Sequence, residues 1–372
     1  MSLQHGRVQQ PIVRKGRVIV YRIFDLAEEI DLRSVESLLR ERQTSRLSLA
    51  RTTGYALVVR NAPVTLALGA STIRVGAAPL SADVYARIWD YGVVSIQFHL
   101  ALRSGMSWNE LVGLAAAAED DNDFDQASRV RASELLSALH AAFKQPHEPR
   151  GMEDYIVYFL QEIDGIRSTA DLADAADIPA LILGEPSSTL SSRLRKTILD
   201  SSFQYSTEDL AVVDWNSALV VEPGGSRDVA DMLEFAATHL TEFRYFDELL
   251  DDKLEQLYDS IERRRLSLFR GHYEQLSREA SSLYIEFSDF VERVENSLKF
   301  VGDFYLATIF RAAVTRFNLR EWEESVTRKM NALARISELL KGQVDVQRSH
   351  WLEIIVIALI LFEVVSAIVR IT

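Results

Sequence analysis

The stretch from Arg227 to the C-terminus contains no proline, and this absence constrains the fold more than any other feature. Proline inside a helix removes a hydrogen bond and clashes with the preceding turn, so a proline-free stretch can hold long unbroken helices. Apolar residues in this stretch recur three or four positions apart, which is the spacing of one helix face. The residues that carry this spacing are Leu250, Leu254, Leu257, Ile261, Leu283, Phe287, Phe290, Val294, Val326, Met330, Leu333, Leu340 and Val344. The pattern predicts a helical coiled-coil domain over residues 227–345, folded as an antiparallel bundle or a helical hairpin.

The segment Glu222-Pro-Gly-Gly-Ser226 interrupts the chain directly before this helical part. Proline and paired glycines break regular structure, and Ser226 can cap the helix that follows. We interpret the segment as a domain junction, with an anion-binding glycine loop as the less favoured alternative. A second break at Asn318 predicts a reversal, after which one helix continues to the C-terminus with Gly342 as its weakest point.

The first part of the chain alternates between strand-like and helix-like segments, which predicts an α+β domain over residues 1–222. Segments rich in β-branched and aromatic residues predict strands at Val18–Phe24, Gly54–Arg60, Val64–Leu68, Ser71–Val75, Gly92–Phe98 and Asp154–Phe159. Helical spacing predicts helices at Leu32–Leu39, Ser107–Ala118 and Gln126–Phe143. Ser107 and Glu110 match a capping box, and the acidic segment Glu119–Asp125 predicts an exposed loop.

Composition and motifs exclude several classes of chemistry. The chain has no cysteine, so disulfides, thiolate metal sites and cysteine nucleophiles are excluded. A net charge of −13 argues against general nucleic-acid binding, and direct DNA binding is not expected. The serine-hydrolase, zinc-protease and phosphate-loop signatures are absent from the sequence. We therefore expect no enzyme activity, no catalytic or cofactor-binding residues, no cofactor and no metal.

A few isolated residues leave alternatives open. His140 and His147 with Glu148 are interpreted as surface residues, although a metal pair with a carboxylate is conceivable. His99 ends an apolar strand and is interpreted as a hydrogen-bonded strand-end residue rather than a base. The aromatic cluster Phe243-Arg-Tyr-Phe246 is interpreted as an anchor that packs the first long helix on the α+β domain, with base stacking as the alternative.

The last 22 residues, 351–372, are rich in Leu, Ile and Val and are long enough to span a bilayer as a helix. They predict a C-terminal transmembrane anchor. Glu363, Ser366 and Arg370 share one helix face, which predicts that they and Glu353 pack against another helix and support assembly. The alternative is a helix buried in a soluble assembly. The expected location is a membrane crossed once at the C-terminus, with the bulk of the chain cytoplasmic, at a bacterial or alternatively a mitochondrial inner membrane.

Several blocks of the sequence resemble the required-for-meiotic-nuclear-division family, which includes the bacterial YagE group. The blocks are Asp90-Tyr-Gly-Val-Val94, the helix from Leu233-Glu through Arg244-Tyr-Phe-Asp-Glu-Leu-Leu250 to Tyr258, the segment Lys299 to Ala307, and the tail from Trp351-Leu-Glu to Glu363-Val. The resemblance implies an N-terminal α+β domain, a helical C-terminal half, a terminal membrane helix and a non-enzymatic tethering role. Eukaryotic members of that family are linked to mitochondria and to organelle translation at the membrane.

The sequence thus predicts an α+β N-terminal domain followed by a long-helix bundle and a C-terminal transmembrane helix. The predicted function is a membrane-tethered, non-enzymatic scaffold that oligomerises through its helical half. Its expected partners are the lipid bilayer, further copies of itself, and an unknown protein or ribonucleoprotein that the α+β domain binds. The alternative is an enzyme or nucleotide-binding protein with an unfamiliar site in the α+β domain.

We predict that Glu363→Leu changes the oligomeric state of the protein. The polar face of the last helix contributes to helix packing only if the carboxylate of Glu363 pairs with a group on another helix, and leucine cannot form that pair. Light scattering on the purified protein in detergent measures the change. An unaltered mass of the assembly would contradict the assembly role of Glu363.

Overall fold

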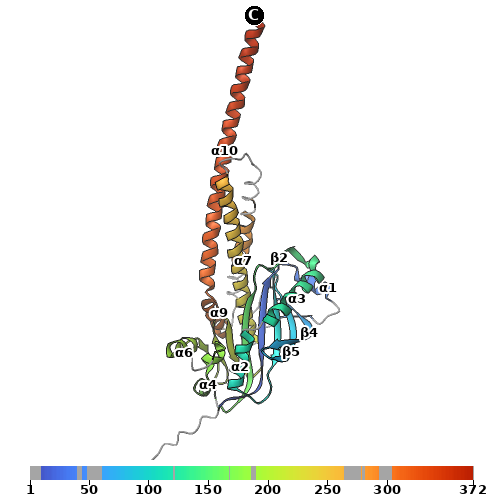
Figure 1. The fold of residues 1–372 in the computed structure, drawn as a ribbon, viewed down its shortest axis with the longest axis vertical. Helices are drawn as coiled ribbons and strands as arrows, with labels where there is room; N and C mark the ends of the chain where they lie inside the picture. The colour runs from blue at the N-terminus through green and yellow to red at the C-terminus, as the bar shows by residue number, and fades with distance from the viewer. Residues whose placement is uncertain are drawn as a thin grey trace, which may run out of the picture. The chain divides into compact units, whose positions relative to one another are not determined.

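A computed structural model describes residues 10–39, 44–47, 61–119, 122–166, 168–185, 190–263, 278, 281–292 and 304–371. The chain forms two compact units. One comprises residues 1–245 and 292–322, and the other comprises residues 246–291 and 323–372. A large mixed sheet organises the first unit (Figure 1). The predicted boundaries at residues 222, 227 and 345 stay predictions.

The sheet is built around its longest strand, β1 (Ile12–Asp25). This strand pairs antiparallel with β6 (Val93–Ala101) on one side and with β9 (Glu153–Asp164) on the other. A parallel pairing of β12 (Ser217–Val221) with β9 makes the sheet mixed. The strand order is β10-β11-β12-β9-β1-β6-β5-β4-β3, with β7 beside β1, and β2 and β8 form a separate pair.

Further strands and several helices complete this unit. The further strands are β2 (Ala27–Ile30), β3 (Thr44–Arg46), β4 (Val64–Val75), β5 (Ala78–Ile88), β7 (Met106–Ser107), β8 (Phe143–Pro146), β10 (Ser202–Phe203) and β11 (Leu210–Val213). The helices are α1 (Leu32–Leu38), α2 (Trp108–Glu119), α3 (Asn122–Ala138), η1 (His140–Ala142), α4 (Thr169–Ala175), α5 (Ile178–Ile182), α6 (Ser192–Leu199) and α9 (Phe304–Arg316). Helix α7 (Asp228–Arg263) begins in this unit, and helix α10 (Leu319–Ile371) follows α9.

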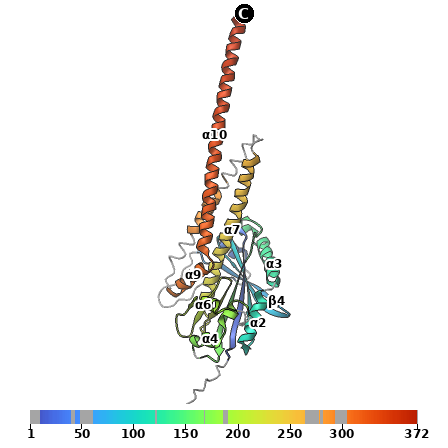
Figure 2. The ribbon, with the colours of Figure 1, turned by 60° about the vertical axis from the view of Figure 1, so that its left-hand side comes forward.

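Both faces of the central strands are covered. Strand β6 is buried at every position except its last, so its side chains pack on both sides of the sheet. On one face Phe98 meets Phe124 of α3 with ring centroids 5.3 Å apart, and α2 and α3 lie along this face (Figures 1 and 2). On the other face Gln97 donates a hydrogen bond to Glu234 of α7. Successive side chains of a strand point to opposite faces of the sheet. The face of β6 toward α3 is therefore apolar here, whereas the face toward α7 is partly polar.

A β-bulge in β4 unites two segments that the sequence predicts as separate strands. The pairing with β5 shifts between Ala67 and Gly69, and Gly69 has a positive φ of 86°. The shift changes which residues face the core, from Leu66 before the bulge to Ile73 after it. Strand β5, which pairs with this strand throughout, is missing from the sequence prediction because its small and polar residues give a weak strand pattern.

The first half of α7 is buried on all sides. Residues 229–243 are buried without interruption, including the polar side chains of Asp231, Glu234 and His239. A helix that is buried all round lies in the interior of a domain rather than on its surface. This explains why the amphipathic pattern of the predicted long helix is weak here and becomes regular only after Phe246.

The second unit consists of packed helical segments from α7, residues 281–292 and α10. Phe246 lies against Phe287 and Phe290, with ring centroids 5.2 and 6.1 Å away. Val326, Met330 and Leu333 are buried at the predicted near-heptad steps. Lys329 of α10 forms ion pairs with Asp247 and Asp251 of α7 at 2.8 and 2.7 Å. The side chains of Leu340 and Val344 lie outside the described part.

The predicted transmembrane anchor at residues 351–372 is wrong. Among the residues that the structure describes, no helix combines the length and the apolar character needed to cross a membrane. The same finding corrects the predicted fold class, which included a C-terminal transmembrane helix. It also corrects the predicted tail-anchored, single-pass membrane location. The segment belongs to helix α10 and carries Glu353, Glu363 and Arg370, whose charges are costly in hydrocarbon. The prediction counted the apolar residues and gave these charges too little weight.

Two local predictions have different outcomes. Asn318 adopts a positive φ of 53° between α9 and α10, so the predicted reversal is confirmed. Helix α10 then continues through Gly342, also as predicted. The acidic loop predicted at Glu119–Asp125 is wrong at its end, because α3 begins at Asn122 and places Asp123 and Asp125 in its first turn, where negative charge is favourable. The predicted strand Gly54–Arg60 lies outside the described residues.

We predict that Gly92→Ala strongly destabilises the protein. Gly92 has a φ of +98°, and a Cβ atom there would lie 1.7 Å from the carbonyl oxygen of Ala27. We expect a loss of more than about 3 kcal/mol in the free energy of unfolding, measured by urea denaturation. The matched control is Gly113→Ala in α2, where a Cβ has no atom within 4 Å and a gain of about 0.5–1 kcal/mol is expected. Similar effects of the two substitutions would contradict the backbone argument.

Candidate functional site

A hollow of about 410 Å³ opens in the first unit where four segments meet. The β10–β11 turn contributes Tyr205 and Asp209, the end of β12 leads into Glu222, helix α7 begins with Asp228, and α9 contributes Tyr305. Small-molecule sites in proteins typically measure about 300–1,000 Å³, so the hollow is large enough for a small ligand or one side chain of a partner. We call it the tyrosine–carboxylate hollow.

Hydrogen bonds to Asp209 fix the shape of the β10–β11 turn. Its carboxylate accepts hydrogen bonds from the backbone N–H of Tyr205 at 2.8 Å and from the backbone N–H and the hydroxyl of Ser206. Burial opposes ionisation of Asp209, but the hydrogen bonds from Ser206 and Tyr205 outweigh it and lower the pKa of this carboxyl. The turn therefore holds Tyr205, which is 69% exposed, at the rim of the hollow.

The Pro-Gly-Gly segment forms another wall and is not an anion-binding loop. The backbone N–H of Gly224 donates to the carboxylate of Glu222 at 3.0 Å, and that of Gly225 donates to the carbonyl oxygen of Glu222 at 3.0 Å. An anion-binding loop needs such N–H groups to point at the ligand, and here both are already used. The segment connects β12 to α7 within a single compact unit.

The hollow is acidic. Glu208, Asp209, Glu222 and Asp228 line it, and none of its described lining residues is a lysine, arginine or histidine. Burial raises the pKa of Glu222; its hydrogen bond from Gly224 opposes the shift, and the charges of Asp209 and Asp228 add to it. Such a site attracts cations and repels the phosphates of a nucleotide. The hollow therefore suits a positively charged group better than a nucleotide.

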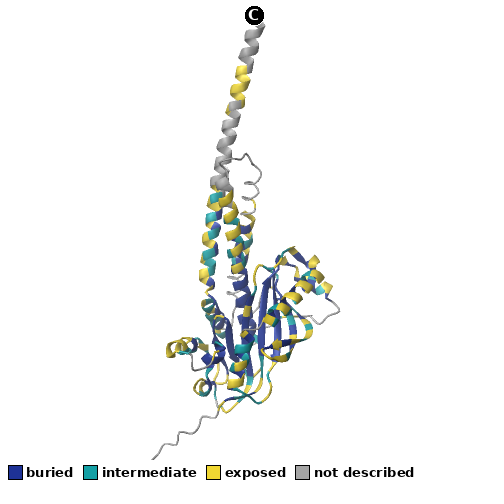
Figure 3. Cartoon of the chain, in the orientation of Figure 1, coloured by how far each residue is buried: buried dark blue, intermediate teal, exposed yellow. Residues whose placement is uncertain are grey.

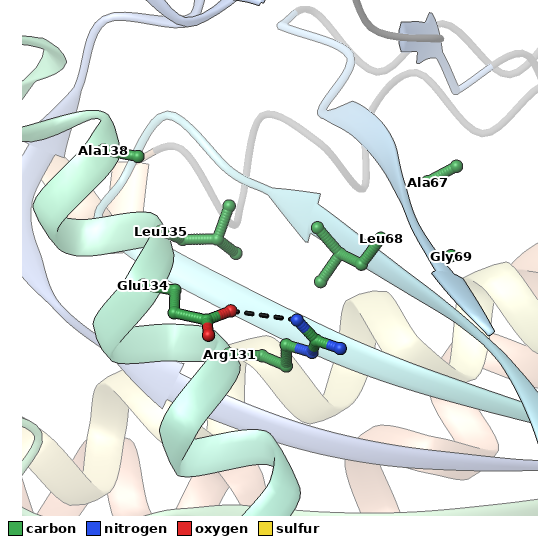
Figure 4. A pocket seen from close by; sticks show the side chains of 7 residues that line it. All are labelled: Ala67, Leu68, Gly69, Arg131, Glu134, Leu135 and Ala138. Atoms are coloured by element: carbon green, nitrogen blue, oxygen red, sulfur yellow. Dashed lines mark hydrogen bonds and ion pairs between the residues drawn. The ribbon is translucent and has the colours of Figure 1, made fainter. Parts of the chain in front are cut away.

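A larger hollow of about 650 Å³ lies between β4 and α3 (Figure 4). Its walls are mainly apolar and include Leu68 at the β-bulge and Leu135 of α3. The two charged residues, Arg131 and Glu134, pair with each other at 3.0 Å. Since these charges already neutralise one another, this hollow has less capacity for specific recognition than the tyrosine–carboxylate hollow.

A buried polar network joins the sheet to α7. Arg87 of β5 donates to Asp231 at 2.9 Å and to Glu234, and Gln97 donates to Glu234 at 2.7 Å. Burial raises the pKa of Glu234 despite the attraction of Arg87. Burial opposes the charge of Arg87, but Glu234 and Asp231 raise its pKa. The hydroxyl of Tyr21, fully buried on the same face, has no hydrogen-bond partner among the described residues. The network is enclosed, so we interpret it as structural.

The buried histidines have pKa values far below neutrality. Burial, reinforced by the charges of Arg227, Arg17 and Arg87, lowers the pKa of His99 to about 2. His99 contacts Gln97 at 3.1 Å, so it is hydrogen-bonded as interpreted, although it lies inside β6 rather than at its end. Burial alone lowers the pKa of His239 to about 3. Neither ring takes up a proton near pH 7, which makes both poor general acids or bases there.

The histidines considered as a metal pair are not brought together with a third ligand. His140 is exposed in η1, whereas His147 stacks on Tyr245 of α7 with ring centroids 4.9 Å apart. Within the described part of the chain, no group of three potential ligands could hold a metal ion. Tyr245 belongs to the predicted aromatic anchor, and Phe243 and Phe246 are buried. Packing is therefore the role of this aromatic cluster.

The residues predicted to support assembly lie near the end of α10. Glu353 is exposed, and the side chains of Glu363, Ser366 and Arg370 lie outside the described part, so their shared role stays a prediction. The same part of α10 contains a run of apolar residues that are exposed, and Figure 3 colours part of this helix as exposed. The run comprises Ile355, Val356, Ile357, Leu359, Ile360 and Leu361, each 50–62% exposed. We call it the apolar run of α10.

A family model for the N-terminal domain of the uncharacterized protein MJ0711 matches residues 15–228. The chain belongs to this family. The uncharacterized protein MJ0711 of Methanocaldococcus jannaschii is 23% identical over 239 residues, which cover 64% of this chain and 73% of the relative. Neither the family description nor the relative indicates an enzyme activity.

The family match corrects the resemblance seen in the sequence. Membership of the required-for-meiotic-nuclear-division or YagE family is wrong, because the matched family is that of the MJ0711 N-terminal domain. The quoted blocks misled because much of their similarity was aliphatic and helical. Asp90-Tyr-Gly-Val-Val94, for example, is a turn leading into β6, where Gly92 is required by its backbone conformation.

We predict that Arg87→Ala destabilises the protein by about 3–5 kcal/mol, because it leaves Glu234 buried without its cation. Urea denaturation followed by circular dichroism measures the loss. Arg103→Ala is the matched control, since Arg103 pairs with Glu110 at 2.8 Å on the surface and little change is expected. Equal losses in the two variants would contradict the structural role of the buried network.

Proposed function

We propose that this protein is a non-enzymatic scaffold that self-associates through its long C-terminal helix and offers its N-terminal unit to a protein or ribonucleoprotein partner. The observation that carries the proposal is the apolar run of α10. Its six large side chains are each at least half exposed, within a helix that continues to Ile371.

The distribution of the run around the helix supports self-association. Successive residues of a helix are rotated by about 100°, so the apolar residues from Ile355 to Leu361, with Ala358 among them, lie on all sides of it. A helix that is apolar on all sides is normally surrounded by neighbours. Further copies of the same helix supply such neighbours without requiring another protein, and closed symmetric assemblies are the commonest oligomers.

The proposed partner surface lies on the N-terminal unit. The chain carries a net charge of −13, which disfavours direct contact with nucleic-acid phosphates. A ribonucleoprotein partner would accordingly be contacted through its protein component. The family match covers residues 15–228, so this unit contains most of what the chain shares with its family.

We predict that Leu361→Glu lowers the oligomeric state of the full chain. The substitution places a charge within the proposed helix interface, at the C-terminal end of the apolar run, where burying a charge without a partner is costly. Sedimentation velocity over a range of protein concentrations measures the change, and we expect at least a tenfold weaker self-association.

The matched control is Leu194→Glu, which changes an exposed leucine of α6 in the N-terminal unit. This variant is expected to assemble as the unmodified chain does. Circular dichroism establishes that both variants remain folded. A monomeric unmodified chain, or equal effects of the two substitutions, would contradict self-association through α10.

A further inference from the structure

We propose that the sheet face beside the start of α7 binds an oxyanion, such as a phosphate or a carboxylate group. The residues that carry this inference are Arg17 and Tyr21 of β1, Tyr85 of β5, His99 of β6, and Arg227 directly before α7. We call them the arginine face. All of them lie in the N-terminal unit, so the inference goes beyond the scaffold function and does not depend on self-association.

The register of the sheet places the strand residues of the arginine face on one side. Tyr21 and Tyr85 both lie opposite Gln97, in the pairings of β1 and β5 with β6. Side chains two positions apart along a strand share a face, so Arg17 and His99 lie on the same side as these residues. This is also the side on which Gln97 donates a hydrogen bond to α7.

The two arginines have donor groups that the fold does not use. Arg17 is half-buried and forms no hydrogen bond or ion pair with the described residues. A terminal nitrogen of Arg227 donates to Asp231 at 3.2 Å and to Gln97 at 3.4 Å, but the buried Nε of this arginine has no partner among the described residues. Guanidinium nitrogens donate hydrogen bonds and do not accept them, so the unused groups suit an acceptor.

The hydroxyl of Tyr21 is a further unused donor. Tyr21 is fully buried, and its hydroxyl has no hydrogen-bond partner within the described part of the chain. Burial raises the pKa of this phenol, the charge of Glu234 adds to the shift, and the charge of Arg227 opposes it. The hydroxyl therefore stays protonated and lies within electrostatic reach of Arg227. A buried donor without a partner is costly, and an oxyanion offers several acceptor oxygens.

Positive charges act together on one point of this face. Burial lowers the pKa of His99, and the charges of Arg227, Arg17 and Arg87 lower it further. The potential at this ring is therefore positive, although the whole chain carries a net charge of −13. The exposed Asp83 lies opposite His99 in the pairing of β5 with β6, so its carboxylate opposes the attraction of an anion.

Tyr85 partly shields the same point from water. Its ring and that of His99 have centroids 4.8 Å apart and are inclined at 50°, and Tyr85 is half-buried. Opposite charges attract each other more strongly where water is partly excluded. The arginine face thus combines unused donors, positive potential and partial shielding.

Other ligands fit the arginine face less well. A metal cation would meet positive charge. A nucleic-acid strand carries many phosphates, and the acidic chain as a whole repels it. Asp228 and Asp231 lie in the first turn of α7, so the helix terminus itself adds little attraction for an anion. The ligand is therefore a small oxyanion or a single acidic side chain of a partner.

The experiment is isothermal titration calorimetry of the full chain at constant ionic strength with two probes. One probe is inorganic phosphate, and the other is the tripeptide Gly-Glu-Gly with blocked ends. The test variants are Arg17→Gln, which removes a charge, and Tyr21→Phe, which removes only the hydroxyl. The matched controls are Arg14→Gln, an exposed arginine of the same strand, and Tyr155→Phe, a buried tyrosine whose hydroxyl contacts two carbonyl oxygens at 3.1 Å. Circular dichroism establishes that the variants remain folded.

We expect saturable binding of one molecule per chain, about tenfold weaker in Arg17→Gln, about fivefold weaker in Tyr21→Phe and unchanged in both controls. Asp83→Asn is expected to bind more tightly, because it removes the opposing carboxylate. Tighter binding of phosphate identifies a free phosphorylated small molecule as the ligand, and tighter binding of the tripeptide identifies an acidic side chain of a protein partner.

Absence of saturable binding by either probe at millimolar concentrations overturns the proposal, because water then satisfies the unused donors. Equal weakening by Arg17→Gln and Arg14→Gln does so too, since it would mean unspecific attraction to any arginine of the strand.

Discussion

The contact of Arg87 with Glu234 and Asp231 links the central strands of the sheet to the helix that covers them. A buried cation of this kind is tolerated only when it is paired and hydrogen-bonded. Gln97 and Arg227 extend the network by donating hydrogen bonds to Glu234 and Asp231, the same carboxylates that pair with Arg87. Because the network fixes the first half of α7 on the sheet, it also fixes where α7 begins. The tyrosine–carboxylate hollow borders that beginning, so its shape depends on this interior contact.

The two proposals concern different parts of the chain and use different physical effects. Self-association relies on the apolar run of α10, where the free energy comes from removing apolar surface from water.

The family match and the described helices correct two interpretations of the sequence. The apolar tail was interpreted as a membrane anchor, and aliphatic blocks were interpreted as family signatures. Both errors have one cause: runs of Leu, Ile and Val are shared by membrane helices, buried helices and assembly interfaces, so composition alone does not separate them. The exposure of individual residues such as Ile357 and Leu361 is a property of the folded chain.

The sequence by itself determined the local features that depend on neighbouring residues. The absence of proline permits the long helices, Asn318 marks the reversal, and the near-heptad steps of Val326, Met330 and Leu333 identify a packed helix face. Only the tertiary structure decided that Arg87 meets Glu234, and that Tyr205, Glu222 and Tyr305 line one hollow. These residues are far apart in the chain, and no local pattern encodes their meeting, because it results from the packing of strands and helices into one unit.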